Sequence, residues 1–124
     1  MTYDDVRAIA LELPDVEEGT SYGTAALKTG GKLFIRLKED GETVVLRTDS
    51  IERDHLMRTK PKIFHITDHY RDYPWVLVRL NAVPRSLMKE LVESAYKRVT
   101  SSRKSRRGAS APGGMRPKRR DSNA

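Results

Sequence analysis

The sequence predicts a single α+β domain, in which helices pack on one mainly antiparallel sheet, followed by a disordered basic C-terminal tail. The length of 124 residues suits one domain. Two glycine-containing dipeptides, Gly30-Gly31 and Asp40-Gly41, separate short runs rich in Val, Leu and Ile, as in antiparallel hairpins. Apolar residues at helical spacing occupy both ends of residues 1–100. We expect the order α-β-β-β-α-β-β-α over residues 1–100, as an α+β sandwich, with the tail at residues 101–124.

The first helix is predicted to begin after Thr2, which is a good N-cap residue. Asp4 and Asp5 follow in the first turn, where carboxylates interact favourably with the helix dipole. Pro14 ends the helix because it cannot continue the hydrogen-bonding pattern. The polar, glycine-containing stretch at residues 15–24 is predicted to be a loop.

Three strands, at residues 25–29, 32–38 and 42–48, are expected to form a meander. A two-residue turn at Asp40-Gly41 makes the numbers of paired residues sum to 81. Because side chains alternate between the two faces of a strand, one face is apolar and is predicted to meet the core. The residues of this face are Leu33, Ile35, Leu37, Val44 and Leu46.

The second half of the domain is predicted to contain two helices and two strands. Asp49 is a suitable N-cap for a helix that runs to about Thr59, and Glu52 is the expected capping-box partner. A weak strand at residues 63–66 and a strong one at residues 75–80 follow. Pro84 suits the first turn of a last, amphipathic helix that ends near Thr100.

The excess positive charge lies in the tail. Residues 101–124 contain eight cationic side chains and one acidic side chain, whereas residues 1–100 contain sixteen of each. A segment this poor in apolar residues cannot bury enough surface to offset the entropy lost on ordering, so we expect it to be disordered. Its cations are Arg103, Lys104, Arg106, Arg107, Arg116, Lys118, Arg119 and Arg120.

Several classes of protein are disfavoured by composition. The chain has no cysteine, which excludes disulfides and thiolate zinc sites. No secretory signal or apolar run long enough for a membrane helix is evident, so we expect a cytoplasmic protein without membrane contact. We predict no cofactor and no metal site, because a polar cluster near residue 68 lies in a strand and a loop rather than on one face of a helix, and no Glu follows its first His as in zinc peptidases. That cluster comprises His65, Asp68, His69 and Asp72.

Several segments carry a resemblance to a known family: Tyr22-Gly23, residues 27–34, residues 73–78 and the closing amphipathic helix. Over residues 3–100 the chain resembles the MmcQ/YjbR family of small bacterial proteins. The resemblance implies a fold similar to type III secretion chaperones and a DNA-binding function, and it identifies no catalytic residues. Family members often have a Lys immediately before the Trp, where this chain has Pro74, so any role of that Lys does not carry over.

The first candidate site is the polar face of the predicted hairpin. Cations interleaved with aromatic residues suit phosphate contact combined with base stacking. Two other interpretations stay open: an ordinary solvated face with a cation–π pair between Phe34 and Arg47, and a protein-binding or dimerisation surface that includes Leu27 and Val45. The candidate nucleic-acid-binding residues of this face are Lys32, Phe34, Arg36, Lys38, Arg47 and Arg79.

The second candidate site is a cleft between the first loop, residues 17–23, and the aromatic segment at residues 70–75. Glu18, Tyr22, Tyr70, Tyr73 and Trp75 are the residues expected to line it. Our leading hypothesis is a non-enzymatic DNA-binding protein whose tail supplies affinity through phosphate contacts. A protein-binding or homodimerising module is the main alternative, and a small-ligand-binding protein or enzyme that uses the cleft is the second.

Overall fold

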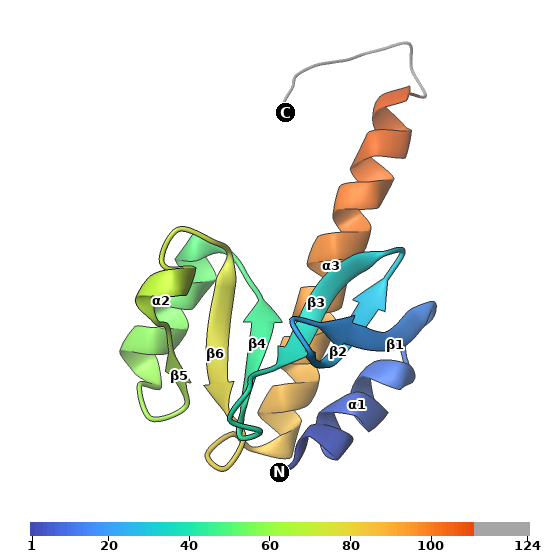
Figure 1. Ribbon diagram of the computed structural model, residues 1–124. Helices are drawn as coiled ribbons and strands as arrows, with labels where there is room; N and C mark the ends of the chain where they lie inside the picture. Colours follow the sequence, from blue (N-terminus) through green and yellow to red (C-terminus); the bar gives the residue numbers. More distant parts are fainter. Residues whose placement is uncertain (111–124) are drawn as a thin grey trace.

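The structure is a computed structural model that describes the backbone of residues 1–110 and the side chains of residues 1–101 (Figure 1). Its six-stranded sheet has the order β1-β2-β3-β4-β6-β5, and every neighbouring pair is antiparallel. The predicted α+β class is confirmed. The elements are α1 (Tyr3–Leu11), β1 (Val16–Ser21), β2 (Thr24–Thr29), β3 (Lys32–Leu37), β4 (Thr43–Arg47), α2 (Ser50–Thr59), β5 (Phe64–His65), a 3-10 turn η1 (Asp68–Tyr70), β6 (Trp75–Arg79) and α3 (Arg85–Ser110).

The prediction of a loop at residues 15–24 is wrong, because this segment contains the edge strand β1. It pairs with β2 from Val16 opposite Thr29 to Ser21 opposite Thr24. The connecting turn holds Tyr22 at φ 54° and Gly23 at φ 81°, as a two-residue hairpin turn requires. The four central residues of β1 are exposed, so the strand has no apolar alternation for sequence analysis to detect.

The register of the β3–β4 hairpin agrees with the prediction, since Ile35 pairs with Leu46 and the numbers of paired residues sum to 81. The connecting loop is longer than the expected two residues. The last backbone hydrogen bond runs from the Lys38 N–H to the Thr43 carbonyl, at 2.8 Å. Within the loop, the Asp40 carboxylate accepts the backbone N–H groups of the two residues that follow Gly41, which fixes the turn.

A β-bulge interrupts the pairing of β2 with β3. Leu27 lies opposite Ile35, but the next residue, Lys28, lies opposite Leu33. Phe34 is therefore the additional residue on β3. A bulge of this kind shifts the alternation of side chains between the faces of the sheet.

The bulge overturns the predicted faces at the start of β3. Phe34 is 0% exposed and packs edge-on against Tyr96 of α3, with 6.1 Å between the ring centroids. Its predicted place on the outer face is wrong. Leu33 was predicted to face the core and instead lines a hollow on the opposite face of the sheet.

The main core lies between the sheet and α3, which crosses β2, β3 and β4 (Figure 1). One row of the core follows the register across four strands, from Leu27 through Ile35 and Leu46 to Val76. All four residues are at most 1% exposed. α1 packs beside α3, and α2 lies against β5 at the other end of the sheet.

Helix α3 runs to Ser110 rather than ending near Thr100 as predicted, and its last turns project beyond the sheet (Figure 1). The cations expected at residues 103–107 therefore belong to a segment with helical backbone. The side chains of these cations lie outside the described residues. So do residues 111–124, for which disorder was predicted and which contain four further cations.

Candidate nucleic-acid interface

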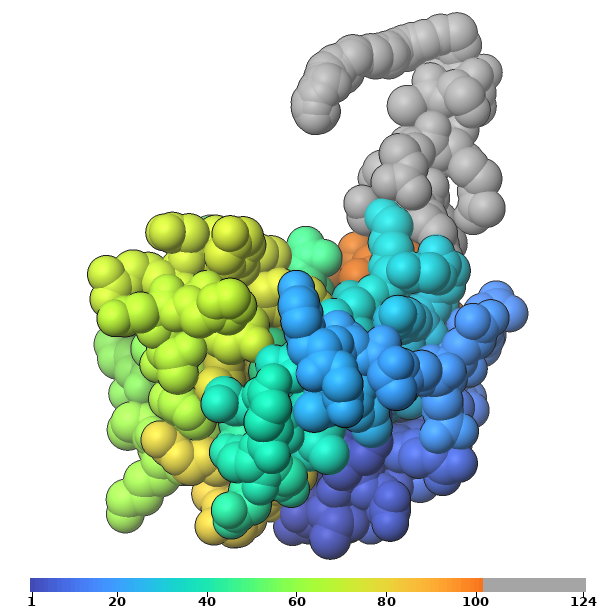
Figure 2. Space-filling model, in the orientation of Figure 1, coloured from blue at the N-terminus to red at the C-terminus, as the bar shows by residue number. Residues whose placement is uncertain are grey.

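The face of the sheet opposite α3 is more buried than the solvated surface that the sequence suggested. Register aligns Ala26, Arg36, Val45 and Leu77 across four strands, and none is more than 5% exposed. The blue turn between β1 and β2 and the yellow-green residues near 70 flank the strands on this side (Figure 2). Burial therefore limits which of the candidate residues a ligand can reach.

Arg36 is a buried structural side chain, and its predicted exposure on this face is wrong. Its Nη2 donates to the Tyr70 hydroxyl at 2.8 Å, and its Nη1 donates to Thr24 Oγ1 at 3.1 Å and lies 3.4 Å from a Glu39 carboxylate oxygen. The guanidinium carbon lies 5.4 Å from the centroid of the Tyr22 ring. Burial acts to lower the pKa of Arg36, but the hydrogen bond to Tyr70 and the Glu39 charge raise it overall.

Most of the predicted cleft exists as a hollow of about 270 Å³, which we name the aromatic hollow. It brings the β1–β2 turn, the segment around η1 and the start of β6 together over the sheet. Four of the five predicted cleft residues line it. Its lining residues are Tyr22, Leu33, Arg36, Val45, His69, Tyr70, Tyr73 and Trp75.

Glu18, the fifth predicted cleft residue, lies elsewhere. Its carboxylate forms an exposed ion pair with Arg7 of α1, with 3.0 Å between Nη2 and Oε2. The hydrogen bond from Arg7 lowers the pKa of the Glu18 carboxyl below its ordinary value. The side chain is therefore a link between β1 and α1, and the predicted role of Glu18 in the cleft is wrong.

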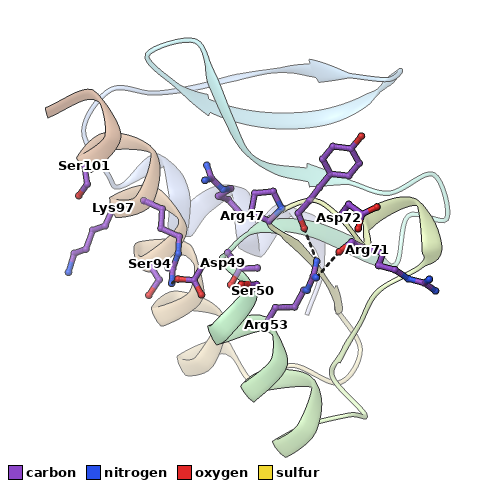
Figure 3. Close-up of a pocket in the computed structure, with 13 residues that line it drawn as sticks. Arg47, Asp49, Ser50, Arg53, Arg71, Asp72, Ser94, Lys97 and Ser101 are labelled. Carbon is purple, nitrogen blue, oxygen red and sulfur yellow. Dashed lines mark hydrogen bonds and ion pairs between the residues drawn. The ribbon is translucent and has the colours of Figure 1, made fainter. Parts of the chain in front are cut away.

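A larger hollow of about 760 Å³ lies between α3, the N-terminal end of α2 and residues 71–74; we name it the basic hollow (Figure 3). Five cationic side chains and two carboxylates line it. The cations are Arg47, Arg53, Arg71, Lys97 and Arg98, the acids are Asp49 and Asp72, and Thr48, Ser50, Tyr73, Pro74, Ser94 and Ser101 complete the wall.

Arg53 holds one wall of this hollow in place. It is 8% exposed, and its Nη1 donates to the carbonyl oxygens of Tyr70, Tyr73 and Trp75 at 3.0, 2.7 and 3.2 Å. Its Nη2 donates to the Arg71 carbonyl at 2.9 Å, and Figure 3 shows part of this set as dashed lines. One guanidinium thus satisfies the carbonyl groups of an irregular segment that borders both hollows.

Besides Arg53, whose nitrogens donate to carbonyl oxygens, two cations in the basic hollow lack a carboxylate partner among the described residues. Arg47 is half-buried, and its Nε is buried without a hydrogen-bond partner. Burial, followed by the nearby charge of Arg98, lowers the pKa of Arg47. Lys97 is exposed at the rim, on α3 (Figure 3). Arg98, by contrast, lies 2.8 Å from carboxylate oxygens of both Asp49 and Glu52.

Glu52 does not complete the expected capping box. The Asp49 carboxylate accepts the Glu52 backbone N–H at 2.8 Å, so Asp49 is the N-cap as predicted. The Glu52 side chain instead accepts the Thr48 hydroxyl at 3.2 Å and pairs with Arg98. This network neutralises Arg98 and leaves Arg47 as the unpaired cation on the floor of the basic hollow.

The remaining predicted cations do not form one patch. Lys38 lies next to the aromatic hollow, in a depression that it shares with Tyr22 and Arg36. Arg79 donates to the carbonyl oxygens of Pro61 and Lys62, at 3.1 and 3.2 Å, at the other end of β6. Lys32 is half-buried at the start of β3.

Leu27 and Phe34 are 0% exposed in the core, so neither lies on the outer face where a dimerisation surface was considered. Within residues 1–110, no helix is long and apolar enough to cross a bilayer. Among the side chains that the structure describes, no group of three or more His, Asp and Glu residues is placed to hold a metal ion.

Comparison with known proteins identifies the family. The YjbR family model matches residues 11–98, most of the folded chain. The chain belongs to the YjbR family. Among solved structures, the Deinococcus radiodurans protein DR2400, described as containing the domain DUF419, aligns with a TM-score of 0.72 and 25% sequence identity. The alignment covers 92% of this chain and 91% of DR2400. No curated protein matches this chain.

The YjbR match spans both hollows apart from Ser101 at the rim of the basic one. It does not include the basic sequence after residue 98. The unpaired Arg47 therefore lies within the matched region, whereas the cation-rich sequence after residue 98 lies outside the family-model match.

Sequence analysis missed Arg53 and the basic hollow. Arg53 stands in a polar helix, and nothing in the local sequence separates it from exposed neighbours such as Arg58. The hollow is assembled from α2, α3 and residues 71–74, which are distant in sequence. Arg47 pairs with Trp75 across β4 and β6, and the two residues had been assigned to separate sites, Arg47 to the polar hairpin face and Trp75 to the cleft.

Proposed function

We propose that this YjbR-family protein is a non-enzymatic DNA-binding protein that contacts phosphates through the basic hollow and the C-terminal part of α3. The carrying observation is Arg47. A half-buried guanidinium that has no ion pair to a described carboxylate, and whose buried Nε has no hydrogen-bond partner, keeps its positive charge available to an external anion. A phosphate oxygen is a suitable acceptor for such a donor.

The surroundings of Arg47 support the proposal. Lys97 adds a second unpaired cation at the rim, and Ser94 and Ser101 add hydroxyl groups. Helix α3 continues from this rim to Ser110, and its sequence there contains Arg103, Lys104, Arg106 and Arg107. The cation-rich sequence therefore begins next to the hollow, and its charge would attract a nucleic-acid strand to this end of the molecule.

Titration of a fluorescein-labelled oligonucleotide, followed by anisotropy, tests the proposal with single-residue variants. Lys97→Gln should weaken binding about fivefold, the counterion-release contribution of one phosphate contact near physiological salt. Lys89→Gln is the matched control, because Lys89 is an exposed lysine of α3 outside both hollows. Equal losses in the two variants would show a response to net charge alone and would remove the basic hollow from the proposal.

A second variant examines the end of α3. Replacing the four cations of residues 103–107 with Gln in the full chain should weaken binding to all sequences alike, because phosphate contacts carry no base information. If about six phosphates are contacted in all, log K of the unchanged protein for duplex DNA should fall with log salt at a slope near −5, from about −0.9 per contact. Undiminished affinity of the variant would remove the cations of residues 103–107 from the proposed binding surface.

A further inference from the structure

The aromatic hollow presents ring surfaces that the fold does not use. Tyr22 is 82% exposed and Tyr73 is 58% exposed, although large apolar side chains are normally covered. Trp75 and Tyr70 are half-buried beside them. A concave site lined by aromatic residues with few polar groups is typical of a ligand-binding site.

The charge of the hollow limits the class of ligand. The Arg36 guanidinium lines it and lies over the Tyr22 ring, with 5.4 Å to the ring centroid. A cationic ligand would be repelled by this charge, so the rings do not form a cage for a quaternary ammonium group. A neutral planar ring has no such penalty and can stack on the tyrosine and tryptophan faces.

A hydrogen-bond donor is available for the edge of such a ring. The Tyr70 hydroxyl accepts a hydrogen bond from Arg36 Nη2 at 2.8 Å. A hydroxyl that accepts in this way keeps its own proton for donation. Among the described residues none accepts that proton in a hydrogen bond, so a carbonyl oxygen or ring nitrogen of a ligand is a fitting acceptor. The volume of the aromatic hollow, about 270 Å³, lies just below the usual range of roughly 300–1,000 Å³ for ligand pockets. A hollow of this volume suits a ligand with one ring system.

The aromatic and basic hollows adjoin. Tyr73 lines both of them. Arg47 of the basic hollow lies directly opposite Trp75 of the aromatic hollow on the neighbouring strands β4 and β6. Side chains of opposed residues lie next to one another on the same face of a sheet. An anion bound at Arg47 would therefore lie beside Trp75, at the border of the aromatic hollow.

We infer that the aromatic hollow binds an unpaired nucleobase, and that the protein prefers single-stranded to double-stranded DNA; this inference rests on the proposed function. In a duplex the bases are stacked inside the helix and cannot reach the rings of Tyr22, Tyr73 and Trp75. A single strand can place a phosphate in the basic hollow and turn the adjoining base onto these rings. Such base stacking tolerates any sequence, because every base has a ring face.

Trp75 gives a direct readout, because it is the only tryptophan in the chain. The full-length protein is titrated with a thymidine single strand, with an abasic strand of the same length, and with a duplex of that length. The thymidine strand should quench Trp75 fluorescence and bind about 5- to 150-fold more tightly than the abasic strand. The abasic strand should bind with a similar salt dependence and without quenching.

Variants separate ring stacking from general effects. Tyr22→Ala, at a position that is 82% exposed and lines the aromatic hollow but not the basic one, should weaken binding of the thymidine strand and leave binding of the abasic strand nearly unchanged. Ile51→Ala is the control, because Ile51 is 83% exposed and lines neither hollow. Circular dichroism of each variant confirms that the fold is intact.

Each contrary outcome has a distinct meaning. Salt-dependent binding with equal affinity for thymidine, abasic and duplex probes, and with unchanged Trp75 fluorescence, would overturn the inference and leave the proposed function standing. Free thymidine that quenches Trp75 as effectively as the strand would overturn the assignment to a nucleic-acid strand. Failure of all probes to bind at any salt concentration would overturn the proposed function together with this inference.

Discussion

Replacing Arg53 with methionine should remove the hydrogen bonds that hold residues 70–75 against α2, and should destabilise the domain. The substitution removes four hydrogen bonds from one buried guanidinium and leaves the carbonyl groups of Tyr70, Arg71, Tyr73 and Trp75 without their donor. Hydrogen bonds to charged groups contribute roughly 1.5–3 kcal/mol each, but three of these share one nitrogen and water can replace some of them. Breaking a buried charged network costs about 3–5 kcal/mol in total, and we expect this loss.

Urea denaturation measures the effect, with Trp75 fluorescence as the signal. For an m value near 2 kcal/mol/M, the expected loss lowers the midpoint by about 2 M. Arg58→Met is the control, because Arg58 is an exposed arginine on the same helix, and its midpoint should shift little. A shift of less than about 0.5 M for Arg53→Met, or equal shifts for the two variants, would refute the reasoning that Arg53 holds the segment.

Three further predictions concern the fold. Phe34→Ala should reduce the free energy of unfolding by about 3–5 kcal/mol, because the ring is 0% exposed in the core; a negligible change in a thermal melt would mean that the ring faces solvent as the sequence suggested. Gly23→Ala should reduce the free energy of unfolding by about 1–2 kcal/mol through its φ of 81° alone, since an added Cβ meets nothing within 4 Å. Gly19→Ala, also in open space but without a positive φ, should leave the free energy of unfolding unchanged. Equal losses of stability in denaturation would contradict the turn geometry. Burial lowers the pKa of His65 from its ordinary value of 6.5, so the unfolded chain binds a proton more readily than the folded chain does. The contribution of neutral His65 to folding stability is therefore complete above about pH 6.5 and is lost as the pH falls below that value. The melting temperature should therefore drop between about pH 7.5 and about pH 5.5, and less so in His65→Gln; parallel pH profiles for the two proteins would exclude this contribution.

The sequence predicted the β3–β4 hairpin well because its apolar residues alternate and Asp40-Gly41 marks the turn. The same rule failed at Phe34, since strict alternation assumes an uninterrupted ladder. The bulge opposite Leu27 and Lys28 breaks that ladder, and no residue type in β3 marks it. One additional residue was enough to exchange the faces of Leu33 and Phe34.

The candidate site was predictable in part. The aromatic segment at residues 70–75 was identified from its composition, and its contact with Tyr22 is present in the aromatic hollow. The basic hollow was not predicted, because it depends on how α3 and residues 71–74 meet in space. The role of Arg36 was also hidden, since a buried, hydrogen-bonded arginine and a surface arginine look alike in a sequence.

The central claim is that unpaired cations of the basic hollow contact phosphates, and the salt dependence of binding tests it most directly. For single-stranded DNA, log K of the full-length protein is measured against log salt and compared with the double variant R47Q/K97Q. Two lost phosphate contacts should make the slope shallower by about 1.4, from about 0.7 per contact on single strands. Identical slopes for the two proteins would show that Arg47 and Lys97 do not contact phosphate and would contradict the account.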